Sequence, residues 1–345
     1  MQKSKKLLLI GGSKGNVHLL NYFNLISSYF DEILVVSDFE FEACPSVLLQ
    51  FEFKSPIALV RHVKALRKVI ESFQPTIIHV HQANAYGFVT CLANQNKAPI
   101  ALTTWGSDVL TLPHKSFLHR WMVKYILKSA KEITADAGYM GAAIEQLIGK
   151  TEVTIANFGV ELSAVEVSAE RAPLIYSNRM HEPLYQIDQI ILQAATFLTH
   201  HPGWILHLAA SGSQTTKLQE LAQQNLPNGS HEFLGFQTGA DNQRNYLAAQ
   251  VYVSIPTTDG TSISLLEAMA YGCIPIVSDL PANREWIEHG KNGLITSGDL
   301  SKDLALAQTL DIQQVQQLNK QIIAQRATKA VNQSKFMALY DRTLA

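Results

Sequence analysis

Residues 256–278 read PTTDGTSISLLEAMAYGCIPIVS, and this stretch decides the fold. An apolar run at 251–255 precedes it, and a short polar loop separates that run from the next element. Residues 263–271 place apolar side chains at helical spacing, and Gly272 ends the helix before a second apolar run at 274–277. A strand, a helix and a second strand in this order predict a βαβ unit, which belongs in a parallel sheet.

The same alternation continues outward through both halves of the chain. In the second half, strands are predicted at 174–177, 204–209, 232–234, 251–255, 274–277 and 293–295, and helices at 187–200, 217–225, 242–249, 263–271, 283–289 and from 304 onward. In the first half, strands are predicted at 7–10, 32–37, 76–81, 100–104, 132–135 and 153–156, and helices at 18–29, 58–72, 86–95, 115–129 and 140–148.

A domain boundary is expected near 157–172, where the sequence lacks clear periodicity. We therefore predict an α/β protein with two Rossmann-like domains, residues 1–160 and 161–330, that face each other across a cleft. The last residues, 331–345, are expected to form a helix that packs back on the first domain. Because open parallel sheets bind ligands at the carboxyl ends of their strands, the cleft between the two sheets is the expected site.

Composition excludes several classes of protein. The 345 residues are 47% hydrophobic and carry a net charge of -1, which fits a folded protein and argues against a nucleic-acid binder. The three cysteines form no CxxC pair, which argues against a zinc ribbon or a disulfide scaffold and favours a cytoplasmic location. No apolar run has the length of a membrane span, and the run at 7–10 is too short for a signal peptide.

The loop and helix start within 259–267 carry the strongest candidates for a ligand site. Free N–H groups and hydroxyls at a helix start suit a diphosphate, and carboxylates suit sugar hydroxyls. The candidate residues are Asp259, Gly260, Thr261, Ser262, Ile263 and Glu267. In the structural alternative, Asp259 or Thr261 caps the helix and Glu267 is a buried partner.

The first predicted strand runs into a loop that contains Gly11, Gly12 and Gly15. Glycines allow the backbone to approach an anion closely, so these three residues are candidates for contact with a phosphate or an acceptor. The loop matches neither the Walker pattern nor G-x-G-x-x-G, and a plain tight turn is the alternative.

Polar side chains also follow two other predicted strands. Trp105 and Asp108 follow the strand at 100–104, and Asp108 is either a catalytic carboxylate or a helix cap. Arg179 and His181 follow the strand at 174–177. A guanidinium at a strand end can bind a diphosphate through two parallel hydrogen bonds, and the alternative is a salt bridge to Glu182 or Asp188.

From Pro256 through Gly293 the sequence resembles the signature of retaining glycosyltransferases of family 4. The matching pieces are EAMAYG at 267–272, NREWI at 283–287 and GKNGL at 290–294, and in outline PTIIHVH at 75–81, NFGV at 157–160 and FLG at 233–235. The resemblance covers nearly the whole chain and is strongest in the second half. It implies the GT-B fold, with two facing Rossmann-like domains and a nucleotide-sugar substrate.

The resemblance also implies roles for individual residues. Glu267 is expected to bind the nucleotide ribose, Asp259 to contact the transferred sugar, and Arg179 to neutralise the diphosphate. Phe236, which follows the strand that flanks the nucleotide base in the family, is expected to contact the base. Asp108, Arg179 and Asp259 are thus the candidate catalytic residues.

Two positions depart from the family pattern. Leu184 and Tyr185 stand where the family commonly has a lysine, about five residues after the arginine, so Arg179, helix dipoles and loop amides must hold the leaving group. Trp105 stands where a histidine commonly lies near the reacting carbon, which puts a catalytic imidazole in doubt, with Asp108 and His181 as weak substitutes.

These features predict a retaining glycosyltransferase that moves a sugar from a nucleotide-sugar, UDP-linked or similar, to a saccharide or lipid-linked acceptor in bacterial surface polysaccharide or lipopolysaccharide synthesis. No DxD motif is placed to hold a metal between phosphates, so we expect neither a metal nor a cofactor. The alternatives are a UDP-sugar epimerase-like isomerase and a non-catalytic nucleotide-sugar-binding protein.

Residues 114–128 predict a basic amphipathic helix. One face of this helix is a candidate for contact with anionic lipid at the inner face of the cytoplasmic membrane, through Phe117, Leu118, Trp121, Tyr125 and Ile126. The alternative is an ordinary surface helix, with its basic face in solvent and its apolar side chains in the core.

His79 and His81 lie on the strand predicted at 76–81. We expect the two side chains on opposite faces of that strand, which excludes a joint metal site.

Overall fold

The apolar run near the amino end forms β1 (Lys6–Ile10), which lies inside a seven-stranded, all-parallel sheet in the computed structural model. The strand order is β3-β2-β1-β4-β5-β6-β7. The other strands are β2 (Glu32–Ser37), β3 (Ser46–Leu48), β4 (Ile77–His81), β5 (Ile100–Thr103), β6 (Glu132–Ala135) and β7 (Val153–Ile155). The reversal of strand order beside β1 is the Rossmann arrangement, which collects loops at the carboxyl edge of the sheet.

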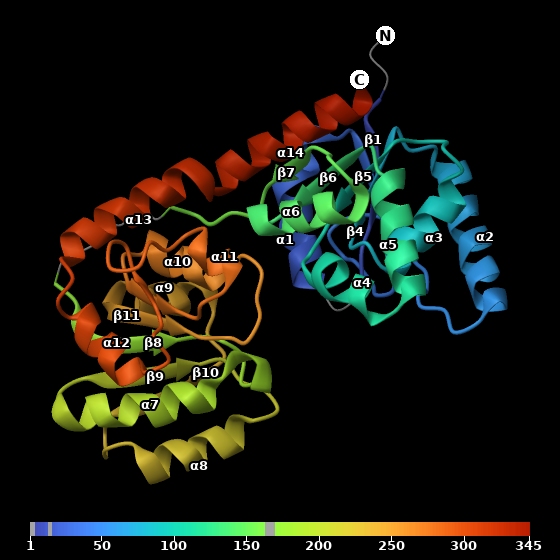
Figure 1. The fold of residues 1–345 in the computed structure, drawn as a ribbon. Helices are drawn as coiled ribbons and strands as arrows, with labels where there is room; N and C mark the ends of the chain where they lie inside the picture. The colour runs from blue at the N-terminus through green and yellow to red at the C-terminus, as the bar shows by residue number, and fades with distance from the viewer. Residues whose placement is uncertain (1–3, 13–15, 163–169) are drawn as a thin grey trace. The chain divides into compact units, whose positions relative to one another are not determined.

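Helices cover both faces of this sheet, which explains why its strands are continuously apolar (Figure 1). The helices are α1 (Asn16–Ile26), α2 (Pro56–Phe73), α3 (Ala85–Asn94), α4 (Leu112–Lys115), α5 (Phe117–Ser129), α6 (Gly138–Ile148) and α14 (Lys329–Leu344), with a 3-10 turn at Ser27–Tyr29 and a π-helical turn at Ser107–Thr111. Leu8 and Ile10 pack in one core cluster with α2, α3, α5 and α6. Leu7 and Leu9 pack in another with α1 and α14.

The second sheet has six parallel strands in the order β10-β9-β8-β11-β12-β13. Its strands are β8 (Ala172–Ser177), β9 (Ile205–Ala209), β10 (His231–Gly235), β11 (Ala249–Ser254), β12 (Ile274–Val277) and β13 (Leu294–Ile295). Its helices are α7 (Ile187–His200), α8 (Thr215–Asn225), α9 (Gly239–Ala248), α10 (Ile263–Ala270), α11 (Pro281–Arg284), α12 (Leu300–Ala307) and α13 (Ile312–Arg326), with a 3-10 turn at Pro183–Tyr185.

The structure describes residues 4–12, 16–162 and 170–345 and divides into two units. Unit 1 comprises Met1–Phe158 and Lys329–Ala345, and unit 2 comprises Gly159–Thr328. These divisions lie close to the expected boundaries at 160 and 330, and α14 packs within unit 1. Each unit is Rossmann-like, which confirms the predicted fold class of two parallel α/β domains.

Several elements differ from the sequence predictions. The helix expected at 115–129 is divided between α4 and α5, because Ser116 adopts an extended conformation and its hydroxyl caps α5 by accepting the N–H of His119 at 3.3 Å. Only α11 is helical in the region predicted at 283–289. The helix expected from 304 onward comprises the end of α12, α13 and α14.

The prediction for His79 and His81 is wrong. Side chains two residues apart on a strand share a face, and the two imidazoles stack with ring centroids 5.2 Å apart. His79 is fully buried, and its Nδ1 lies 2.8 Å from the Tyr22 hydroxyl and 2.7 Å from the Tyr340 hydroxyl. Its Nε2 lies 2.8 Å from the Thr103 hydroxyl, so both nitrogens serve to join α1, α14 and the sheet.

Candidate functional site

The polar loop after β11 leads directly into the start of α10. The carboxylate of Asp259 accepts the N–H of Gly260 at 3.0 Å, and the Ser262 hydroxyl caps α10 by accepting the N–H of Leu265 at 3.4 Å. Thr261 is buried at the same turn. Ile263 packs its side chain against an apolar cluster, so only its backbone N–H is available to a ligand. The helix start therefore presents backbone N–H groups beside a carboxylate and hydroxyls.

Arg179, just after β8, reaches this helix start. Its guanidinium donates to the Asp259 carboxylate at 2.7 Å, to the Ser264 hydroxyl at 2.8 Å and to the Ser262 hydroxyl. Its Cζ lies 4.4 Å from the ring centroid of Tyr185, a stacked cation–π contact. Arg179, Asp259, Ser262 and Ser264 are called the arginine cluster below. The side chains of Arg179 and Asp259 are only 11% and 23% exposed, so their orientation is well constrained.

Burial and pairing set the charges of this cluster. Burial lowers the pKa of Arg179, but the neighbouring Asp259 carboxylate, together with Tyr252 and Tyr185, offsets this and leaves the pKa above its ordinary value. Burial raises the pKa of Asp259, and Arg179 and the Gly260 N–H oppose that rise. The guanidinium is therefore a fixed cation at the start of α10, where an anion is favoured by both the cation and the helix dipole.

Glu267 lies farther along α10 and is held by a buried tyrosine. The Tyr246 hydroxyl lies 3.1 Å from the Glu267 carboxylate and 3.2 Å from the Ser264 carbonyl, and it accepts the Asn178 amide at 2.8 Å. Tyr246 is fully buried, and Tyr252 donates to Asn178 at 3.2 Å. A continuous hydrogen-bonded network thus orients Glu267 and reaches the arginine cluster through Ser264.

Two other candidates of unit 2 lie apart from the arginine cluster. His181 is buried, with Nδ1 3.0 Å from the Thr215 hydroxyl and its ring edge-on to Phe233. Burial lowers the pKa of His181, so the imidazole is a neutral part of the packing rather than a group aimed at Asp259. Phe236 follows β10 and is 83% exposed, which leaves its ring free to stack on a flat ligand.

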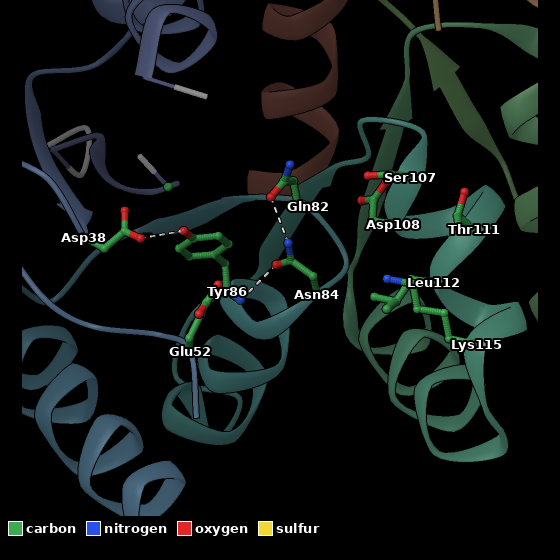
Figure 2. Close-up of a pocket in the computed structure, with 11 residues that line it drawn as sticks. Asp38, Glu52, Gln82, Asn84, Tyr86, Ser107, Asp108, Thr111, Leu112 and Lys115 are labelled. Atoms are coloured by element: carbon green, nitrogen blue, oxygen red, sulfur yellow. Dashed lines mark hydrogen bonds between the residues drawn. The ribbon is translucent and has the colours of Figure 1, made fainter. Parts of the chain in front are cut away.

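Unit 1 carries a polar pocket of about 340 Å³ at the carboxyl edge of its sheet (Figure 2). The polar pocket is lined by Gly12, Asp38, Glu52, Gln82, Asn84, Tyr86, Ser107, Asp108, Thr111, Leu112 and Lys115. In Figure 2, Asp38, Glu52 and Tyr86 lie on one side, and Ser107, Asp108, Thr111, Leu112 and Lys115 lie on the other. These groups come from the segments that follow β1, β2, β3, β4 and β5, so the fold assembles them from distant parts of the sequence.

The glycine loop contributes to the polar pocket through Gly12. A Cβ atom on Gly12 would lie only 1.9 Å from the Tyr86 hydroxyl, so only glycine fits there without moving Tyr86. Gly11 packs against Leu19, and a Cβ on it would lie 2.7 Å from that side chain, which gives Gly11 a packing role. Gly15 lies outside the described residues.

Asp108 joins two loops of the polar pocket. Its carboxylate is almost fully buried and accepts the N–H of Ala83 at 2.7 Å and the N–H of Trp105 at 3.0 Å. Burial raises the pKa of Asp108, and these N–H groups oppose the rise. The side chain is therefore not a helix cap: it binds the loop after β4 to the loop after β5.

The imidazole of His81, which the sequence analysis considered only for a metal site, lies beside Trp105. The indole Nε1–H donates to Nδ1 of His81 at 3.1 Å. Because Nδ1 is an acceptor, the proton of the neutral ring is on Nε2. Burial lowers the pKa of His81 to about 3, with a further contribution from His18, so the ring is neutral at physiological pH. The pair orients the Trp105 indole.

Other site residues were missed by the sequence analysis. Ser264 lies at the start of the predicted helix, and Asn178 is next to Arg179. Both could have been found from the sequence, because each is close to a residue that was already a candidate. Asp38, Gln82 and Tyr86 gave no such signal, because only the sheet brings their loops together. Within the described ranges, no three His, Cys, Asp or Glu side chains are grouped so that they could hold a metal ion.

Family comparisons match both units. Residues 161–326 match the family model described as glycosyl transferases group 1, and residues 6–137 match the model described as glycosyl transferase 4-like. Both models describe glycosyltransferases, and together they span most of the chain. The arginine cluster lies within the first match, and the polar pocket lies within the second.

Solved structures agree with this fold. The chain superposes on HepE of Anabaena in complex with UDP with a TM-score of 0.79 and 18% identity, over 98% of this chain and 100% of that one. HepE has also been solved with UDP-glucose and with UDP and glucose. A glycosyltransferase from Rickettsia africae superposes with a TM-score of 0.80 and 13% identity, over 99% of both chains.

A sequence relative is known over part of the chain. An exopolysaccharide phosphotransferase of Streptomyces coelicolor is 31% identical over 128 residues, which are 36% of this chain. The match spans only 13% of that relative's length.

Proposed function

We propose that this protein is a retaining, metal-independent glycosyltransferase that uses a UDP-sugar and extends a saccharide or lipid-linked saccharide for a bacterial surface polysaccharide or lipopolysaccharide. The observation that carries the proposal is the arginine cluster: a constrained guanidinium, two hydroxyls and a carboxylate at the start of α10. The UDP complexes of the similar HepE fold support UDP as the nucleotide.

The donor would bind across unit 2. Arg179 and the N–H groups at the start of α10 would hold the diphosphate, and Glu267 would accept hydrogen bonds from the ribose hydroxyls. Phe236 would stack on the base. In the unliganded cluster Asp259 neutralises Arg179. A diphosphate would therefore compete for the guanidinium, and Asp259 would turn to the hydroxyls of the transferred sugar.

The reaction needs charge stabilisation more than covalent help. As the bond from the sugar to the diphosphate breaks, negative charge grows on the leaving phosphate, and Arg179 and the N–H groups at the start of α10 would stabilise that charge. The positive charge of the guanidinium is the reason that we propose metal independence. Retention would follow from attack on the same face, with the departing phosphate accepting the acceptor proton.

The chain is also proposed to contact an anionic membrane through an apolar patch on unit 1. Exposed apolar side chains gather on α2 and α5, the two helices that pack against α3. The patch comprises Ile57 and Val60 on α2 and Phe117, Leu118 and Trp121 on α5; Phe117 is 86% exposed. The prediction that Ile126 contacts the membrane is wrong, because its side chain is buried in the core.

Charge favours a lipid surface as the occupant of this patch. Arg61, Lys64, Lys68 and Arg120 are exposed on the same two helices, and residues 109–131 contain no Asp or Glu. The described residues contain no helix long and apolar enough to cross a bilayer.

Vesicle binding tests this contact. The triple variant Phe117→Ser, Leu118→Ser, Trp121→Ser should lose at least about tenfold in partitioning to vesicles of 30% phosphatidylglycerol, because three large apolar side chains no longer insert. Leu192→Ser, which removes an exposed leucine of α7, is the matched control. Equal partitioning of the triple variant and the control, or no preference of the parent protein for anionic over neutral vesicles, would contradict the contact.

A nucleotide screen tests the proposed activity itself. In thermal-shift measurements with UDP-, GDP- and CMP-sugars, the UDP-sugars should raise the Tm, and acceptor-free incubation should release UDP slowly. Conversion of the UDP-sugar to an isomer would indicate an epimerase instead. Binding of UDP with neither transfer nor hydrolysis of any nucleotide-sugar would leave only a binding protein.

A further inference from the structure

The polar pocket of unit 1 offers an ordered set of hydrogen-bonding groups. Asn84 donates to the Gln82 side-chain oxygen at 2.8 Å and accepts the N–H of Tyr86 at 3.0 Å, and the Tyr86 hydroxyl donates to Asp38 at 2.9 Å (Figure 2). These bonds fix the direction in which each polar atom points. The pocket is therefore organised before any ligand arrives.

The backbone at Gln82 supports this organisation. Gln82 has φ 76°, in the left-handed region that non-glycine residues rarely adopt, and its N–H donates to the Thr103 carbonyl at 2.8 Å. Strained backbone of this kind persists where the surrounding structure holds it, and it is concentrated at ligand sites. The amide NH₂ of Gln82 makes no hydrogen bond to any residue that the structure describes, which leaves two donors for a ligand.

The chemistry of the lining fits a ring with many hydroxyl groups. A sugar hydroxyl both donates and accepts, so it needs carboxylate or carbonyl acceptors beside amide or ammonium donors. The pocket supplies acceptors from Asp38 and Glu52 and donors from Gln82, Asn84 and Lys115, with the Tyr86 ring as an apolar wall. A cavity of about 340 Å³ is at the small end of small-molecule sites, which fits a single sugar unit.

The carboxylates of the lining disfavour the binding of an anionic ligand. Asp38, Glu52 and Asp108 carry carboxylates, and Lys115 is the cationic residue of the described lining. An acidic group on the ligand would meet two carboxylates at the side of Asp38 and Glu52, where repulsion is screened only in part.

We propose that the polar pocket binds the terminal sugar of the acceptor and accepts only a hydroxyl-rich unit without an acidic group, such as a neutral hexose. This proposal rests on the proposed function, and it names the class of acceptor that unit 1 would bind. Asp38 and Glu52 are the residues that exclude a uronic acid. Gly12 keeps the pocket open, because any Cβ there would displace Tyr86.

The test compares matched pairs of sugars on the full chain. The probes are the methyl β-glycosides of glucose, galactose and mannose and of their uronic acids, which differ only at C6, with binding measured by titration of ¹⁵N-TROSY spectra. At least one neutral glycoside should bind, and its uronate should bind about tenfold more weakly or not at all. The double variant Asp38→Asn, Glu52→Gln should reduce that preference to within about twofold, because the amide oxygens still accept hydrogen bonds without repelling the acid.

Three outcomes overturn the proposal. The first is equal or tighter binding of the uronate by the parent protein. The second is that no neutral glycoside binds. The third is undiminished binding of the neutral glycoside by Gly12→Ala. UDP titration is run in parallel: UDP binding with failed glycoside binding rejects the pocket proposal alone, whereas absent UDP binding rejects the proposed function.

Discussion

Replacing Arg179 with alanine is expected to lower kcat about 100- to 1000-fold while UDP affinity falls much less. The reason is that the guanidinium lies at the start of α10, where the leaving phosphate would gain charge as the sugar departs. An interaction that strengthens in the transition state affects turnover more than ground-state binding. Initial rates with a UDP-sugar and calorimetric titration with UDP measure the two effects separately.

The control for Arg179→Ala must separate the loss of catalysis from the effect of leaving Asp259 unpaired. Removing Arg179 leaves the Asp259 carboxylate without its cation, which destabilises the fold independently of catalysis. The double variant Arg179→Ala, Asp259→Asn removes that penalty, and thermal unfolding confirms that it folds. Arg179→Lys keeps the charge but not the planar fork, and it should recover only part of the turnover. Turnover near that of the parent protein in the alanine variants would contradict the assignment.

Replacing Glu267 with alanine is expected to weaken binding of UDP and of uridine alike, by about 10- to 100-fold, because a charged hydrogen-bond acceptor for the ribose is lost. Since Glu267 acts on the nucleoside and not on the leaving phosphate, kcat at saturating UDP-sugar should change far less than in the Arg179 variant. Titration calorimetry with UDP and uridine measures the loss.

Tyr246→Phe is the matched control for Glu267. It keeps the buried ring and removes only the hydroxyl that contacts the Glu267 carboxylate. The expected loss of UDP affinity is about threefold to tenfold, because the Glu267 carboxylate stays in place but loses one hydrogen bond that orients it. Unchanged UDP affinity in Glu267→Ala, or a loss confined to UDP with uridine unaffected, would show that Glu267 does not bind the ribose.

The elements that the sequence predicted well are those whose signal is local. β1 and β12 are short apolar runs bounded by glycine, and α10 begins at a serine cap, so each is encoded within a few consecutive residues. Where a cap interrupts a periodic stretch, as Ser116 does, periodicity alone merges two helices into one. The prediction that His79 and His81 lie on opposite faces of their strand misapplied the strand period. Residues two apart on a strand share a face, so the sequence itself was enough to place them correctly.

The site was predictable where its residues follow neighbouring strands of one parallel sheet. Arg179 follows β8, and Asp259 follows the adjacent β11, so neighbouring parallel strands bring them to one edge. Which partner each group chooses was not predictable, because Ser264, Tyr246 and Asn178 are joined through side-chain directions that depend on packing. His81 was discounted although it contacts Trp105.

By itself the sequence determined that this chain forms two parallel α/β units and that an acid-bearing helix start follows the strand at 251–255, because hydrophobic period, caps and glycines act over a few residues. The pairing of Arg179 with Asp259, and the grouping of Asp38, Gln82 and Asp108 around one pocket, became known only from the tertiary structure. Contacts between residues far apart in the chain depend on how strands order themselves in a sheet and how side chains pack on it, and no local pattern carries that information.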